Sequence, residues 1–116
     1  MNILNEPSLD FDSIAILKEA TEEMFNEIIE VYLNDTPERL SLLREAFNSK
    51  DLKVLTEESH CIKGSSGNVG AIKLAKICEY IEKSSRDNNL TDHNEYIQYA
   101  VEEFDIVKKE LEKLLD

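Results

Sequence analysis

Residues that interrupt helices are scarce in this chain. Its 116 residues include only three glycines and two prolines, and tryptophan is absent. Glycine and proline are frequent in the tight turns that connect strands, so their scarcity favours an all-α domain over a strand-rich one. A chain of this length is large enough for one hydrophobic core. We therefore predict a single domain over residues 1–116, of which residues 1–9 form a loosely ordered N-terminal segment.

Positive charge, long apolar runs and cysteine are also in short supply. Thirteen Lys and Arg stand against 25 Asp and Glu, and the formal net charge of −12 argues against nucleic acid or an anionic membrane as a partner. No uncharged run approaches the roughly 20 apolar residues that span a bilayer. Acidic residues such as Glu6 and Asp10 come early, where a secretory signal would be basic and then apolar. Two cysteines are too few for a disulfide framework, and reduced thiols indicate a cytoplasmic protein.

Most of the chain repeats apolar residues at three- and four-residue steps, which predicts several amphipathic helices. Short connections between such helices imply an antiparallel bundle. Thr36 is a good N-cap and Pro37 suits the first helical position, so we place a boundary between two helices there. The other predicted boundaries are an N-cap at Asp12 or Ser13, a helix start near Asp51, a turn or close backbone approach at Gly70, and an N-cap at Thr91 after a loop over 84–92.

The stretch SHCIKGSSGNVGA, residues 59–71, holds all three glycines and one of the two histidines. On a helical wheel, Lys63, Gly64 and Gly67 share a face with His60. A glycine inside a helix costs roughly 1 kcal/mol relative to alanine, and packing of the core cannot require one on an exposed face. We expect these glycines to clear space for a molecule that approaches His60. The opposite, inward face carries Glu58, Ile62, Ser65, Ser66 and Val69, of which only Glu58 disagrees with burial.

The residue types around His60 suit a site that binds an anionic group. Lys63 follows His60 by three residues, so the two side chains are neighbours on a helix. Between Glu58 and Glu79 the chain has three lysines and no carboxylate, which predicts a local positive field. An unperturbed imidazole is largely neutral at pH 7, and the neutral ring is a nucleophile. These residues suit acceptance of a phosphoryl group by His60, with Lys63 balancing the charge on its oxygens.

The same stretch resembles the signature of the histidine-containing phosphotransfer (HPt) domains of bacterial phosphorelays. That signature is a histidine followed by x-x-Lys-Gly-Ser-Ser and then by an apolar residue, Gly and Ala. The resemblance implies an all-α fold, an antiparallel four-helix bundle with one or two additional short N-terminal helices. Glu58 and Gly67 depart from the residues that are common at their positions. The matching residues are His60, Lys63, Gly64, Ser65, Ser66, Val69, Gly70 and Ala71.

The resemblance also implies a function. His60 would accept a phosphoryl group from the aspartyl phosphate of one receiver domain and pass it to the aspartate of another, and Gly64 and Gly67 would lie where the receiver docks. The expected partners are receiver domains of response regulators or hybrid sensor kinases. The carrier would have neither kinase activity nor a nucleotide site, and no cofactor of its own, because Mg²⁺ belongs to the receiver. We expect a monomer; a free-standing carrier and a domain of a larger sensor kinase both fit the sequence.

Other interpretations of the polar residues are weaker. His93, among acidic and amide neighbours, is interpreted as a surface residue. Cys61 and Cys78 match no zinc-site spacing, so no metal site is expected. A helical bundle that binds a receiver or a partner helix without being phosphorylated remains the alternative function. Three apolar residues of the first helix could belong either to the docking surface or to the core: Phe11, Ile14 and Leu17.

Overall fold

The computed structural model describes residues 2–115, so Met1 and Asp116 of the predicted domain lie outside the description. Every regular element in the described part of the chain is helical, which confirms the predicted all-α class. The elements are η1 (Ile3–Asn5), α1 (Phe11–Thr21), η2 (Glu22–Met24), α2 (Phe25–Ser49), α3 (Leu52–Asn68), α4 (Ile72–Arg86) and α5 (His93–Glu112), where η denotes a 3₁₀ turn.

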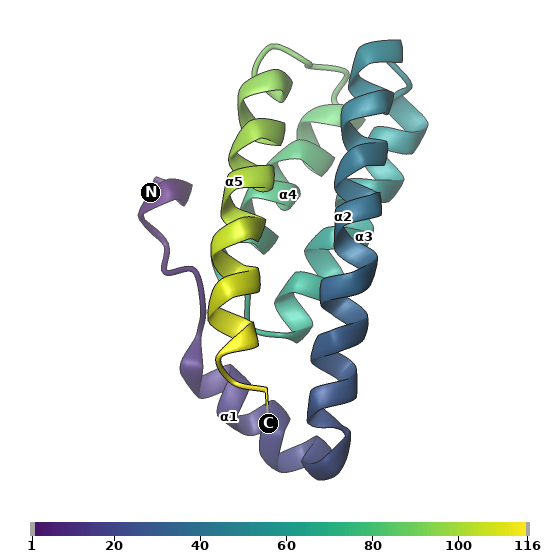
Figure 1. Cartoon of the computed structure of the whole chain (residues 1–116). Coiled ribbons are helices and arrows are strands. Elements are labelled where there is room, and N and C mark those ends of the chain that lie inside the picture. The colour runs from purple at the N-terminus through teal and green to yellow at the C-terminus, as the bar shows by residue number, and fades with distance from the viewer. Residues whose placement is uncertain (1, 116) are drawn as a thin grey trace.

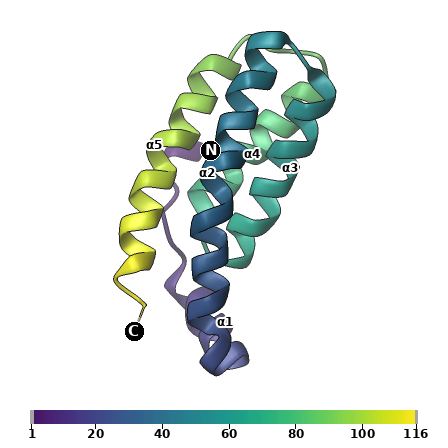
Figure 2. The same ribbon diagram turned by 45° about the vertical axis from the view of Figure 1, so that its right-hand side comes forward.

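Helices α2 to α5 form an antiparallel four-helix bundle (Figure 1). Helix α3 contacts α2 and α4, and α5 contacts the same two helices, so α3 and α5 lie diagonally across the bundle. Helix α2 extends past its neighbours at one end, where α1 lies across it (Figure 2). The predicted bundle is therefore confirmed, and α1 with the two 3₁₀ turns forms the additional N-terminal part.

The core lies between the four long helices and consists mainly of aliphatic side chains. Complete burial of such a side chain stabilises the fold by about 1.5–3 kcal/mol relative to exposure. In the described chain, no helix is both long enough and apolar enough to cross a bilayer. The largest side chains that are almost fully buried include Phe25, Ile29, Leu43, Leu55, Ile62, Leu74, Ile77, Ile81, Ile97 and Leu111.

The predicted boundary between two helices at Thr36 and Pro37 is wrong, because α2 continues through both residues. The Thr36 hydroxyl donates to the carbonyl of Tyr32 at 2.7 Å instead of capping a new helix. Pro37 is exposed, while Leu33 and Leu40 on either side of it are buried. One apolar stripe therefore runs the length of α2, and its packing outweighs the roughly 3 kcal/mol that a proline costs inside a helix.

Aspartate side chains cap the N-termini of α1 and α3. Helix α1 is capped by Asp10, not by Asp12 or Ser13, because the Asp10 carboxylate accepts the backbone N–H groups of both later residues. Helix α3 begins after Asp51 as predicted, and the Asp51 carboxylate accepts the N–H of Val54 at 3.2 Å. Both caps satisfy backbone donors that the first helical turn leaves without partners.

The loop before α5 is shorter than predicted. Helix α4 continues to Arg86, so the connection covers residues 87–92 instead of 84–92. Thr91 does not cap α5, because its hydroxyl donates to the side chain of Asn89. The residue before α5 is Asp92, and its carboxylate accepts the hydroxyl of Tyr80. The Thr91 hydroxyl is therefore used in a bond within the loop and does not cap α5.

His93 is buried, which contradicts its interpretation as a surface residue. Its exposed fraction is 0%, its Nε2 lies 2.8 Å from the Ser85 hydroxyl, and its ring stacks on Phe47. Ser85 donates its hydroxyl hydrogen to the carbonyl of Ile81, so it accepts from Nε2–H of His93. Nδ1 is buried without a hydrogen-bond partner. Burial lowers the pKa of His93, and the ring is neutral at pH 7.

The segment before α1 packs on the bundle. Turn η1 contacts α4, and the Glu6 carboxylate lies 3.8 Å from the ammonium of Lys76. Leu9 is buried. The chain then enters α1 beside Gly70, which forms the turn between α3 and α4 with a φ of +78°. Gly70 thus marks both a turn and a close backbone approach, as predicted.

Candidate functional site around His60

His60 lies in the middle of α3 and faces solvent. Its side chain is 60% exposed, whereas Ser59, Ile62 and Ser66 on the other side of α3 are fully buried. The amphipathic pattern of α3 therefore orients His60 outward, as predicted from the helical wheel.

Gly64 and Gly67 continue the surface around His60 along α3. A Cβ atom added at either position would meet no atom outside its own helical turn within 4 Å. Packing against the described residues therefore does not require glycine at position 64 or 67. The surface beside His60 is therefore open at both glycines, over about 10 Å of helix from His60 to Gly67.

Glu82 of α4 is the residue of this site that the sequence analysis missed. Its carboxylate is only 3% exposed, and Oε2 lies 3.0 Å from Nδ1 of His60. Lys63 places its ammonium 2.7 Å from Oε1, and Arg86 places a guanidinium nitrogen 2.6 Å from Oε2. One buried carboxylate thus joins His60 to two cations across the interface of α3 and α4.

The charge balance of the site differs from the predicted positive field. Burial by itself raises the pKa of Glu82, but hydrogen bonds from Lys63 and His60 and the charge of Arg86 bring it below its ordinary value. Glu82 is therefore ionised at neutral pH and balances one of the two cations. The absence of carboxylates between Glu58 and Glu79 holds in the sequence but not in space, because α4 brings Glu82 back beside α3.

A signal for Glu82 does exist in the sequence. It occupies a helical position next to Ile81 and four residues after Cys78, both buried on the core side of α4. A carboxylate on a stripe that packs against the neighbouring helix needs a charged partner, because an unpaired buried charge is strongly unfavourable. The partner could not be identified from the sequence, since it depends on how α3 and α4 align.

The contact with Glu82 determines which nitrogen of His60 can react. An ionised carboxylate only accepts hydrogen bonds, so Nδ1 of the neutral ring carries the hydrogen and Nε2 keeps its lone pair. No described residue donates to Nε2 in this structure. In its neutral form His60 therefore presents Nε2 as the nucleophile, held in one orientation by the bond at Nδ1.

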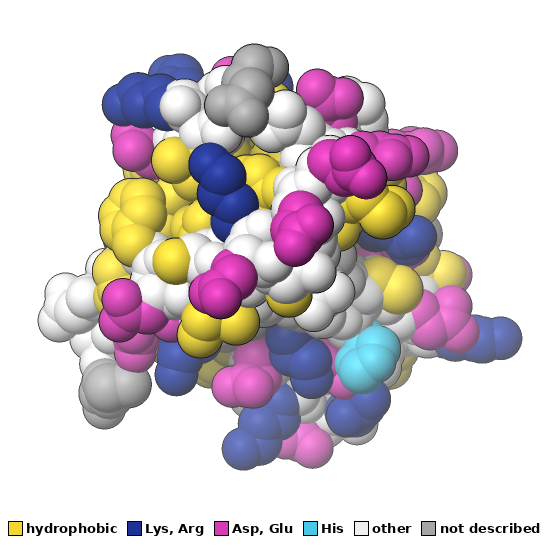
Figure 3. All heavy atoms as spheres, turned by 90° about the horizontal axis from the view of Figure 1, so that it is seen from below, with side chains coloured by type: hydrophobic (Ala, Val, Ile, Leu, Met, Phe, Trp, Pro, Cys, Tyr) yellow, Lys and Arg dark blue, Asp and Glu magenta, His cyan; other side chains and the backbone are white. Residues whose placement is uncertain are grey.

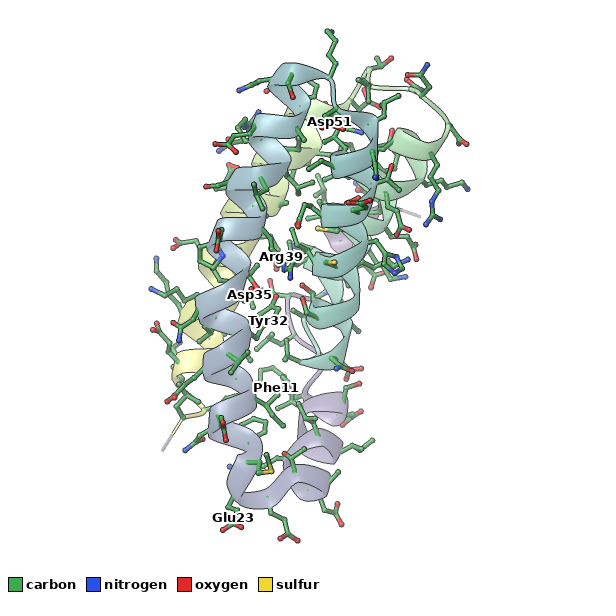
Figure 4. The ribbon with its side chains drawn as sticks, turned by 90° about the vertical axis from the view of Figure 1, so that its right-hand side faces the viewer. Phe11, Glu23, Tyr32, Asp35, Arg39 and Asp51 are labelled. Carbon is green, nitrogen blue, oxygen red and sulfur yellow. The ribbon has the colours of Figure 1, made fainter. Side chains whose placement is uncertain are left out.

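The inward residues of the motif have packing roles. The Ser66 hydroxyl lies 2.8 Å from the hydroxyl of Tyr32, and both are buried. Glu58 accepts the Arg39 guanidinium at 2.8 and 3.0 Å, which explains how a carboxylate fits on the inner side of α3. Tyr32 and Arg39 both reach from α2 toward α3 (Figure 4).

The two cysteines occupy different environments. Cys61 is exposed beside His60, while Cys78 is fully buried and burial raises its thiol pKa to about 12. Within residues 2–115, no three His, Cys, Asp or Glu side chains are placed to hold a metal ion together.

The site belongs to a region that matches a known family. The family model described as the Hpt domain matches residues 27–116, from the first turn of α2 through α5. The chain belongs to the Hpt domain family. Helix α1 lies before the matched region of this Hpt domain.

Solved and curated relatives agree with the Hpt assignment. The crystal structure of histidine-containing phosphotransfer protein B (HptB) from Pseudomonas aeruginosa superposes with a TM-score of 0.90 and 31% identity, over 94% of this chain and 95% of that one. The phosphorelay intermediate protein rdeA of Dictyostelium discoideum is 30% identical over 105 residues, 90% of this chain. Multistep phosphorelay regulator 1 of Schizosaccharomyces pombe is 33% identical over 73 residues, 62% of this chain. This Hpt chain spans only 39% and 25% of those two curated proteins, respectively.

Proposed function

We propose that this chain is a phosphocarrier in a phosphorelay and that His60 is the residue that carries the phosphoryl group. The observation that supports this most directly is the His60–Glu82 contact, which leaves Nε2 as an exposed nucleophile in a fixed orientation. Membership in the Hpt family and the likeness to named phosphorelay intermediates support the same function.

The transfer step follows from the geometry of the ring. The lone pair of Nε2 attacks the phosphorus of an aspartyl phosphate, a P–N bond forms, and the P–O bond to the aspartate breaks to release its carboxylate. The ring then carries positive charge, which the buried carboxylate of Glu82 stabilises through Nδ1–H. Attack by the aspartate of a second receiver reverses the step and restores the neutral ring.

Lys63 is proposed to balance the charge of the phosphoryl group. A phosphoryl group adds a charge of about −1.5 to −2 at neutral pH. The Lys63 side chain is 31% exposed beside His60 and its ammonium is already paired with Glu82, so it is held at the site before the group arrives. Arg86 occupies a comparable place on α4 and is 62% exposed. Both cations are available to the oxygens of the phosphoryl group.

The proposed partner is a receiver domain that docks over Gly64 and Gly67. Large apolar side chains are also exposed on α1 and the start of α2, and Figure 3 shows hydrophobic side chains on this end of the molecule. Of these, Phe11 lines a pocket with Ile106 of α5. Of the three candidates of the first helix, Phe11 is 61% exposed, Leu17 is half-buried and Ile14 is buried. We expect a transient interface of less than roughly 1,200 Å². The exposed apolar residues at this end are Phe11, Ile16, Met24 and Val31.

The remaining properties of the proposed carrier follow from the same assignment. It would have no kinase activity or nucleotide site, and the Mg²⁺ needed for transfer would be bound by the receiver. We propose that it acts as a monomer in the cytoplasm.

Incubation with a phosphorylated receiver domain tests the function. Wild type should take up label, His60→Gln should take up none, and His93→Gln, which changes the buried histidine, should retain uptake. A folded wild-type protein that binds the receiver without taking label would favour the second function, a bundle that binds receivers without phosphorylation. Screening all receiver domains of the source organism would identify donor and acceptor.

A further inference from the structure

Gly70 makes a contact that the proposed phosphotransfer does not use. Its carbonyl accepts the backbone N–H of Asp10 at 2.8 Å, immediately before α1 begins. Its φ of +78° lies in the left-handed region, which a residue with a side chain rarely adopts. The turn that follows the helix of His60 is therefore bonded directly to the start of α1.

The space beside Gly70 is filled by α1. A Cβ atom at position 70 would lie 2.8 Å from Cγ1 of Ile14 and 3.1 Å from the carbonyl oxygen of Asp10. Ile14 is only 5% exposed. The missing side chain of Gly70 thus creates a notch that the Ile14 side chain occupies, whereas the positions of Gly64 and Gly67 are open.

The notch holds the one buried side chain of α1. Ile14 is the only residue of α1 that is buried, while Phe11 and Ile16 are 61% and 69% exposed. Helix α1 otherwise contacts the lower end of α2 and the turn η2. Figure 2 shows α1 lying across the end of the bundle and not within it.

We propose that Gly70 is a positioning residue. Its contacts with Asp10 and Ile14 hold α1 in a fixed position relative to His60. The inference rests on the proposed function, because the surface that it positions is the one offered to a receiver. Gly70 follows α3, which carries His60, Gly64 and Gly67. These contacts therefore fix the position of α1, with its exposed Ile16, relative to the helix that carries His60. Loss of these contacts weakens docking of the receiver domain and leaves the reactivity of His60 unchanged.

The test separates docking from chemistry by using two phosphoryl donors. Phosphoramidate reacts with an accessible histidine without a docked protein, whereas the phosphorylated receiver must dock. Ile14→Ala and Gly70→Ala should each raise the KM for the receiver by roughly tenfold, the change given by about 1.4 kcal/mol of lost docking free energy. The kcat and the rate of labelling by phosphoramidate should stay at the wild-type values. Val101→Ala, a similar truncation at an exposed site on the diagonal helix α5, is the matched control and should change neither quantity.

The double variant Ile14→Ala/Gly70→Ala distinguishes a notch from simple backbone strain. If the two residues share one contact, its KM should be no higher than that of either single variant, whereas independent effects would multiply. Hydrogen exchange of the α1 amides should accelerate in each single variant while the exchange of α3 remains slow.

Two results would overturn the inference. One is a wild-type KM in Ile14→Ala, which decides the question even if Gly70→Ala fails to fold. The other is a multiplied KM in the double variant. Failure of phosphoramidate or the receiver to label wild type at His60 would instead count against the proposed function.

Discussion

The Glu82 carboxylate lies 3.0 Å from Nδ1 of His60, although 22 positions of sequence separate the two residues. Glu82 is almost completely buried and His60 is mostly exposed, so the contact ties a reactive surface group to a fixed point of the bundle. Such a bond selects the tautomer with a free Nε2 and limits rotation of the ring, which prepares the site before a receiver arrives.

Replacement of Glu82 by glutamine should slow phosphorylation of His60. The amide keeps the size of the side chain but removes the charge that stabilises the developing imidazolium, so we expect a loss of about 10- to 100-fold in the rate of labelling by phosphoramidate. Glu79→Gln makes the same change at an exposed position one turn earlier on α4 and should leave the rate near that of wild type. Equal rates for both variants would show that Glu82 has no part in the chemistry.

The buried His93 should make stability depend on pH. Its pKa is lowered in the folded state, so the unfolded chain binds a proton more readily. The stabilising contribution is therefore complete above the ordinary value of 6.5 and declines as the pH falls through that value toward the folded pKa. Urea unfolding between pH 7.5 and 5.5 should show this decline in wild type and a flatter profile in His93→Gln. Parallel profiles would mean that other groups cause the pH dependence.

Replacement of Pro37 by alanine should stabilise the protein. Pro37 lies inside α2, where it lacks the N–H that would bond to the carbonyl of Leu33. Alanine supplies that donor and has the highest helix propensity, so we expect a gain of about 1–3 kcal/mol in the free energy of unfolding. Thermal unfolding measures the change, and labelling at His60 should be unaffected. A lower melting temperature would indicate that α2 requires the local bend of a proline.

Substitutions at Gly64 should separate stability from docking. Because a Cβ meets no neighbour there, Gly64→Ala should raise the free energy of unfolding by about 0.5–1 kcal/mol. Gly64→Lys should leave thermal stability near that of wild type and still reduce transfer from the receiver, because its long side chain occupies the proposed docking surface. Normal transfer by Gly64→Lys would place the receiver elsewhere, and a large loss of stability would contradict the exposed position.

Much of the reactive face could be predicted from local sequence alone. His60, Lys63, Gly64 and Gly67 lie within two turns of one helix, and helical geometry fixes their relative directions once the apolar pattern identifies the inner side. The N-cap at Asp51 was predictable for the same reason, since it depends on residues three positions apart.

Local rules failed where packing with a distant element decides the outcome. Pro37 fits a helix start by propensity, but the continuous stripe of α2 keeps it inside one helix. His93 has polar neighbours in sequence, but Phe47 and Ser85 from two other helices enclose it. In both cases the contacts formed by burial outweigh the smaller preferences of single residues.

The sequence by itself determined that this protein is a helical bundle with an outward histidine on a glycine-bearing face, because those features depend on periodicity and on neighbours within a few residues. Only the tertiary structure decided that Glu82 meets His60, that His93 is enclosed and that Ile14 fills the notch at Gly70. Such contacts depend on the alignment of whole helices, which is set by the packing of the entire core and not by any one segment.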